Sequence, residues 1–159
     1  SSTSWTSGAK SAFIATIPSV EAFARALEPI ADEPIFECIR RAGRLVMDRT
    51  DRDHDETLAR LTIIHEEPAL YARGLRLDLD WRAAISRLVI ARSTASSMDE
   101  LELRAAAIGG AVTGAFRAAM NIWVRHQGRI PLRLLGDQAL DVVEGGLPAS
   151  LPRARTRPA

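Results

Sequence analysis

The stretch from Ser97 to Gly128 constrains the fold of this chain more than any other part of the sequence. It opens with Ser97-Met98-Asp99-Glu100, a pattern typical of a helix capping box. Alanine and glycine then recur in a helical stretch, although each interior glycine costs a helix about 1 kcal/mol. Small residues let another helix backbone approach closely, so we expect a helix at the centre of a bundle or across a subunit interface. These residues are Ala105, Ala106, Ala107, Gly109, Gly110, Ala111, Gly114, Ala115, Ala118 and Ala119.

The length and the cysteine content of the chain limit the classes of protein to which it can belong. A chain of 159 residues suits one domain with a sizeable core. The single cysteine, Cys38, excludes a disulfide framework within one copy. We therefore expect one domain in a reducing, cytoplasmic setting.

The charge balance argues against a nucleic-acid surface on this chain. Three of its 21 basic residues lie in the Pro-rich end 148–159, which leaves 18 against 20 acidic residues in 1–150. No expected helix concentrates arginine without nearby acidic residues, whereas a phosphate-binding surface needs a basic stripe. The longest uncharged run, 105–116, has 12 residues and is too short for a membrane span of about 20. We expect no membrane contact.

Periodicity and turn signals predict an all-α antiparallel bundle of about six helices. The helices are expected to begin near Ser19 and Pro34, after a polar hinge loop at 51–55, and then at Ala69, Ser97 and Pro131. The domain organisation follows from this pattern. Residues 1–18 are predicted to be a flexible arm or the remnant of another domain, 19–147 a helical domain, and 148–159 a disordered tail.

The search for catalytic chemistry finds no site. His65-Glu66-Glu67 lacks the second histidine that a zinc protease helix needs four residues after the first, since Ala69 stands there. Cys38 has no adjacent histidine or second cysteine, and a buried apolar role is expected for it. No strand precedes a glycine-rich phosphate loop. We therefore predict no catalytic residue, no metal, no cofactor and no enzymatic activity.

A binding cavity is the better functional candidate, because bundle helices that mix aromatic residues, methionine and glycine leave adaptable apolar space. The alternative reading of the same residues is a filled core. Polar groups expected within reach of a ligand are Tyr71, Asn121, Arg40 and Thr113. The candidate walls are Phe36, Ile39, Gly43, Met47, Tyr71, Leu75, Trp81, Ile85, Phe116, Met120 and Trp123.

Two segments carry a resemblance to a known family. The first is LARLTIIHEEPALYAR at 58–73, followed by Trp81. The second runs from LRAAAIGGA at 103–111 to AAMNIW at 118–123, followed by a glycine break and a short Leu-rich helix. Over about residues 33–146 the chain resembles the C-terminal regulatory domains of the TetR (tetracycline repressor-like) family, especially the mycofactocin-regulator type.

The resemblance implies a regulatory domain of a transcriptional repressor that binds a small apolar or amphipathic effector and forms a homodimer. Its last two helices would then build a four-helix interface with those of a second copy. The alternative is a structural bundle that dimerises without a ligand. The expected interface residues are Gly110, Ala111, Gly114, Ala115, Ala118, Ile122, Leu132, Leu135, Ala139 and Val143.

The resemblance also bears on DNA binding. Family members begin with a helix-turn-helix domain, and residues 13–23 are similar to the stretch that closes it. The dozen residues upstream are too few for a recognition helix and its turn. We therefore expect contact with DNA only where a helix-turn-helix is supplied elsewhere.

Overall fold

The computed structural model describes residues 20–28 and 32–146 and confirms the all-α fold, with no strand in these ranges. Its helices are α2 (Val20–Ala26), α3 (Ile35–Arg52), α4 (His54–Glu66), α5 (Pro68–Arg92), α6 (Met98–Arg125) and α7 (Leu132–Gly145). The arm predicted at 1–18 and the tail predicted at 148–159 lie outside the described residues.

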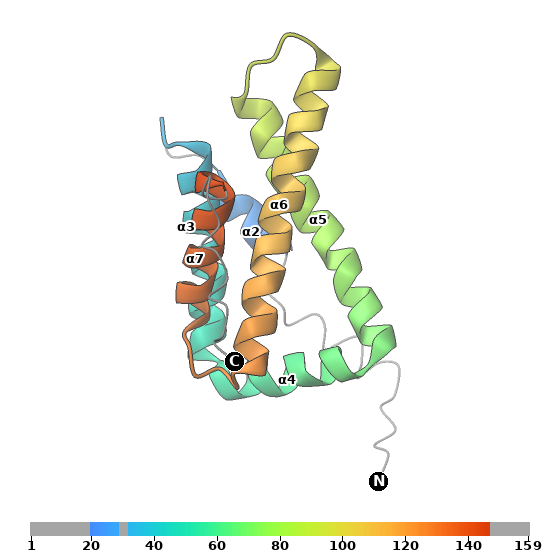
Figure 1. Cartoon of the computed structure of the whole chain (residues 1–159), viewed down its shortest axis with the longest axis vertical. Helices are drawn as coiled ribbons and strands as arrows, with labels where there is room; N and C mark the ends of the chain where they lie inside the picture. Colours follow the sequence, from blue (N-terminus) through green and yellow to red (C-terminus); the bar gives the residue numbers. More distant parts are fainter. Residues whose placement is uncertain (1–19, 29–31, 147–159) are drawn as a thin grey trace, which may run out of the picture.

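The long helix α6 occupies the centre of the bundle, as its small residues predicted. It packs along α5 on one side and along α7 on the other, and α7 in turn packs on α3. Figure 1 shows consecutive long helices running in opposite directions, with α4 crossing one end of the bundle. None of the described helices is both long and apolar enough to cross a membrane.

Two groups of buried side chains form the core. The first joins α2, the start of α3, the end of α5, the first half of α6 and the second half of α7, and it includes Phe23, Ile39, Ile85, Val112 and Leu140. The second joins α4, the end of α6 and the start of α7, and it includes Leu61, Trp123 and Leu132. Phe116 packs against both groups, so α6 links them.

The ends of α6 follow the sequence signals closely. The Ser97 hydroxyl accepts the backbone N–H of Glu100 at 3.2 Å, which confirms Ser97 as the N-cap. The carboxylate of Glu100 accepts the N–H of Ser96, not that of Ser97, at 3.0 Å. After the last turn, Gly128 adopts a φ of +66° and its N–H donates to the carbonyl of Trp123 at 2.9 Å.

The hinge loop predicted at 51–55 is wrong. α3 continues to Arg52 and α4 begins at His54, so that Asp53 alone separates them. Asp51 of this segment instead contacts the start of α7. Its carboxylate accepts hydrogen bonds from the backbone N–H groups of Leu132 and Arg133, at 2.9 and 3.2 Å, and so caps that helix. A local pattern of Asp and Arg carries no information on such a partner.

Candidate functional site

Four helices and the first residue of α7 line a partly open apolar cavity of about 150 Å³. α3, α5 and α6 each present residues at helical spacing, so one face of each helix forms a wall. α4 closes one end with Leu61, Ile64 and His65. The other lining residues are Gly43, Val46, Met47 and Thr50 of α3, Tyr71, Gly74, Leu77, Asp78, Trp81 and Ile85 of α5, Thr113, Phe116, Arg117, Met120 and Asn121 of α6, and Leu132.

Glycines shape this cavity in two ways. A Cβ built at Gly43 would lie 2.6 Å from Cζ of Phe116, so the aromatic ring rests directly on the α3 backbone. At Gly74 a Cβ would meet nothing within 4 Å, which leaves open space beside α5. Gly43 thus permits a close contact between α3 and α6, whereas Gly74 widens the cavity.

Polar side chains gather between α4, α5 and α6. Asp78 forms an ion pair with Arg117, whose guanidinium carbon lies 5.7 Å from the centre of the Tyr71 ring. Nε2 of His65 lies 2.8 Å from Oδ1 of Asn121, and its Nδ1 lies 3.0 Å from the carbonyl oxygen of Leu61. These groups give an otherwise apolar cavity a polar edge at which a ligand can be oriented.

A second cavity, of about 110 Å³, adjoins the first between α3 and α4. Polar and charged residues form much of its wall, namely Arg49, Asp53, Glu56, Thr57 and Arg60. The two cavities share the lining residues Val46, Thr50, Leu61, Trp81 and Met120.

The structure brings most of the predicted cavity residues together around the larger cavity. Those lining it are Gly43, Met47, Tyr71, Trp81, Ile85, Phe116 and Met120, together with the predicted polar groups Tyr71, Thr113 and Asn121.

Four predicted wall residues lie outside both cavities. Ile39 belongs to the first core group, Phe36 is partly buried against that group, and Trp123 is fully buried in the second. Leu75 is 42% exposed on the outer side of α5. Helical phase explains the error at Leu75, because cavity residues of α5 repeat at 71, 74, 78, 81 and 85. The same phase would have found Gly74 and Asp78.

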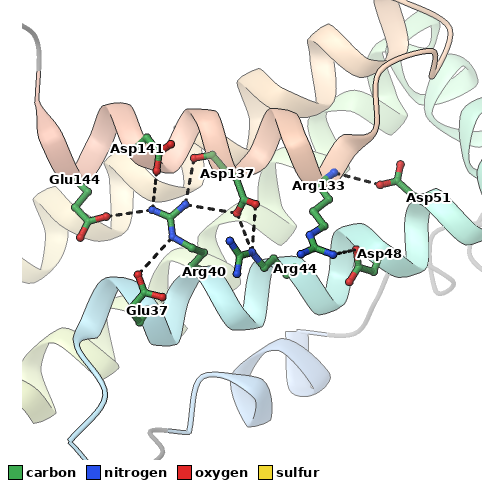
Figure 2. Close-up of polar contacts among 9 residues, drawn as sticks. All are labelled: Glu37, Arg40, Arg44, Asp48, Asp51, Arg133, Asp137, Asp141 and Glu144. Carbon is green, nitrogen blue, oxygen red and sulfur yellow. Dashed lines mark hydrogen bonds and ion pairs between the residues drawn. The ribbon is translucent and has the colours of Figure 1, made fainter.

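Arg40 lies away from the cavity, in a charge network that joins α3 to α7. Figure 2 shows its guanidinium surrounded by carboxylates, with 2.9 Å to Asp141 and 3.1 Å to Glu144. Burial alone would lower the pKa of Arg40, but hydrogen bonds and charges from Asp141, Glu144 and Asp137 raise it overall. Arg44 adds a contact of 3.0 Å to Asp137. The network holds α7 on α3 and leaves Arg40 no role at the cavity.

The predicted interface residues divide between the two last helices. On α6, Ala111, Gly114 and Ala118 are exposed, whereas Gly110, Ala115 and Ile122 are half-buried. On α7, the predicted residues pack within the chain: Leu132 and Leu135 are buried, and Ala139 and Val143 are partly buried against the two core groups. The apolar residues that α7 exposes are Leu134 at 49% and Val142 at 57%.

Comparison with known proteins identifies one family. A family model described as the MftR C-terminal domain, of the TetR type, matches residues 33–148, a range that includes α3 to α7. No curated protein and no solved structure matches the chain significantly.

Proposed function

Since this chain belongs to the TetR family of transcriptional regulators, with a C-terminal domain of the MftR type, we propose that it binds a small apolar or amphipathic effector and forms a homodimer. The effector would occupy the apolar cavity between α3 and α6, and the dimer would form through α6 and α7.

The main support for effector binding is the cavity itself. Ligand sites are concave and mostly apolar, with a few convergent polar groups, and this cavity combines apolar walls with the edge formed by His65, Tyr71 and Asn121. Its volume of about 150 Å³ is near that of a cavity known to hold one benzene molecule. A filled core would leave no such space.

An exposed stripe on α6 supports the dimer. Leu103, Ala107, Ala111, Gly114 and Ala118 recur every three or four residues and are all exposed. Leu103 is 72% exposed, and α7 beside it adds exposed Leu134 and Val142. A flat apolar face of this kind suits a symmetric contact with a second copy.

A stacked pair of aromatic side chains connects the wall of the cavity to α2. Trp81 lines both cavities, and its ring stacks on that of Phe23 with the centroids 4.3 Å apart. Phe23 is fully buried and belongs to α2, which precedes the range matched by the family. An effector that moves Trp81 would therefore shift α2, so occupancy would be coupled to whatever α2 carries.

Thermal unfolding in the presence of mono- and bicyclic apolar compounds tests the effector. Binding to the folded state alone raises the melting temperature in a saturable way. Native mass spectrometry of the protein as purified reports its subunit number and any retained molecule. A dimer that no compound stabilises would support the structural bundle instead.

A cavity-filling variant locates the site. Gly74→Leu places a side chain in open space and should abolish the shift, whereas Ala72→Leu, at an exposed position on the same helix, should retain it. An unchanged shift in Gly74→Leu would place the ligand elsewhere.

A further inference from the structure

The wall of the larger cavity contains one buried hydroxyl group. Of the hydroxyl, amide, imidazole and charged side chains that the described structure places in this wall, Thr50 alone is buried, at 8% exposure. His65 and Asn121 are exposed, and the others are partly exposed. Thr50 also lines the second cavity, so it lies where the two cavities adjoin. A ligand in the larger cavity would therefore meet this side chain away from water.

The proton of the Thr50 hydroxyl already has an acceptor. Oγ1 of Thr50 lies 3.2 Å from the carbonyl oxygen of Val46, one turn earlier on α3, and a carbonyl oxygen can only accept. The hydroxyl thus donates to its own helix and keeps its lone pairs. A ligand that donates to this oxygen adds a hydrogen bond, whereas a ligand that accepts from it must take the proton from Val46.

The charges in the walls of the two cavities do not favour an ion. Carboxylates and guanidinium groups occur there in equal numbers: Asp78 and Arg117 in the larger cavity, and Asp53, Glu56, Arg49 and Arg60 in the second. In both cavities an ion pair joins a member of each kind. Because the transfer of an ion out of water into such a balanced site is costly, an uncharged ligand suits the cavity better.

Aromatic rings supply much of the remaining wall. Tyr71 and Trp81 of α5 and Phe116 of α6 line the larger cavity. Flat rings pack against such side chains by offset stacking or edge-to-face contact. The volume of about 150 Å³ suits one ring, and the second cavity adds space beside Thr50.

We propose that the occupant is an uncharged compound of one or two rings that donates a hydrogen bond, through an N–H or O–H group, to Oγ1 of Thr50. This inference rests on the proposed effector function and adds the ligand's chemical class and orientation. The rings lie among the aromatic side chains, and the donor points to the place where the two cavities adjoin.

Two probes of the same shape test the donor. Indole has an N–H group where benzofuran has an oxygen atom, and titration calorimetry on the full 159-residue chain gives both affinities. We expect indole to bind about fivefold more tightly, as for one net hydrogen bond. Without a partner in the cavity, indole would bind no more tightly than benzofuran, because its N–H would lose its hydrogen bond to water.

Threonine-to-valine variants identify the acceptor. Thr50→Val removes the oxygen with little change in size, so the affinity for indole should fall about fivefold and that for benzofuran should stay within about twofold. Thr62→Val is the matched control, because Thr62 donates to the carbonyl of Leu58 at 2.8 Å in the same way but lines neither cavity. It should change neither affinity by more than about twofold.

Two further variants at Thr50 control for other causes. Thr50→Ser keeps the hydroxyl and should keep the preference for indole. Thr50→Ala removes the oxygen together with the methyl group, and it replaces Thr50→Val if that variant does not fold. The indole preference should disappear in Thr50→Ala even if both probes bind more weakly.

The outcomes separate this inference from the proposed function. Equal affinity for the two probes, or tighter binding of benzofuran, overturns the donor site and leaves an apolar effector cavity in place. A preference for indole that persists in Thr50→Val, or that Thr113→Val removes instead, also overturns it. Binding of other compounds but of neither probe does the same. If no compound binds at all, both the donor site and the effector function fail.

Discussion

The inward and outward faces of α6 both carry alanine and glycine, but these small residues have different neighbours on the two faces. On the inward face, a Cβ at Gly109 would lie 2.7 Å from the Ser86 hydroxyl and 3.1 Å from the backbone oxygen of Arg82. On the outward face, a Cβ at Gly114 would meet nothing within 4 Å. One glycine allows α5 to approach inside the chain, whereas the other lies on an uncovered surface.

The difference shows what a run of alanine and glycine can and cannot reveal. Small residues indicate that a backbone comes close, because a larger side chain would keep it away. They do not indicate whether that backbone belongs to the same chain. On α6 the inward face packs on α5, whereas the outward face at Gly114 is uncovered in this chain.

The largest expected effect comes from overpacking the inward face. Gly109→Leu should lower the free energy of unfolding by about 3 kcal/mol, because the new side chain meets the α5 backbone. Urea unfolding followed by circular dichroism measures this loss. Ala72→Leu, at an exposed position of α5 outside the proposed dimer contact, is the control. A loss in Gly109→Leu no larger than that of the control would show that α5 can move aside.

Overpacking the outward face should act on association. Gly114→Leu should weaken the proposed dimer by about 1 to 3 kcal/mol, or roughly 5- to 150-fold in its dissociation constant. Sedimentation velocity across a concentration series measures the constant, with Ala72→Leu on α5 as the control. The same mass before and after the change would show that this surface is not the contact.

Alanine at the two glycines should give changes of opposite sign. Gly114→Ala should raise the free energy of unfolding by up to about 1 kcal/mol in dilute solution, because alanine is the better helix former and the site is open. Gly109→Ala should lower it by about 1 kcal/mol, since the Arg82 backbone must shift. Changes of the same sign in urea unfolding would refute the contrast between the faces.

The smallest expected effect concerns the end of α6, which His54 ties to α4. Its Nδ1 lies 2.8 Å from Oδ1 of Asp55, its Nε2 lies 3.1 Å from the carbonyl oxygen of Gly128, and its ring contacts Trp123 edge to face. Asp55 first, and then the Gly128 carbonyl, raises the pKa of His54. Both acceptors favour the protonated ring.

The sign of the pH effect follows from that direction. A pKa raised by folding means that the His54 contribution is fully present below the ordinary value of about 6.5 and is lost as pH rises through the folded-state pKa. The stability difference between the unaltered chain and His54→Gln should therefore be larger at acidic than at alkaline pH. Thermal unfolding of both proteins across that range measures it. A difference that grows toward alkaline pH would contradict the assignment.

Helix positions were predictable to a useful degree because their signals are local. Ser97, Pro131 and the Gly145-Gly146 pair mark ends that the structure confirms. The cavity could be predicted in part from the sequence, since aromatic residues, methionine and glycine at helical spacing indicate three of its walls. Aromatic and aliphatic character alone misplaces Leu75, because it does not fix the phase of the helix. It also misses Gly74, because a glycine contributes space and not contact.

The sequence by itself determined that this chain is an all-α bundle built around a long helix with small-residue faces. Caps, proline positions and apolar periodicity act over about one helical turn, so they can be read without knowing the fold. Only the tertiary structure decided that Asp51 caps a helix beginning 81 residues later and that Arg40 binds α7 and not a ligand. Such pairings depend on which faces meet when the helices pack, and no local pattern of residues contains that information.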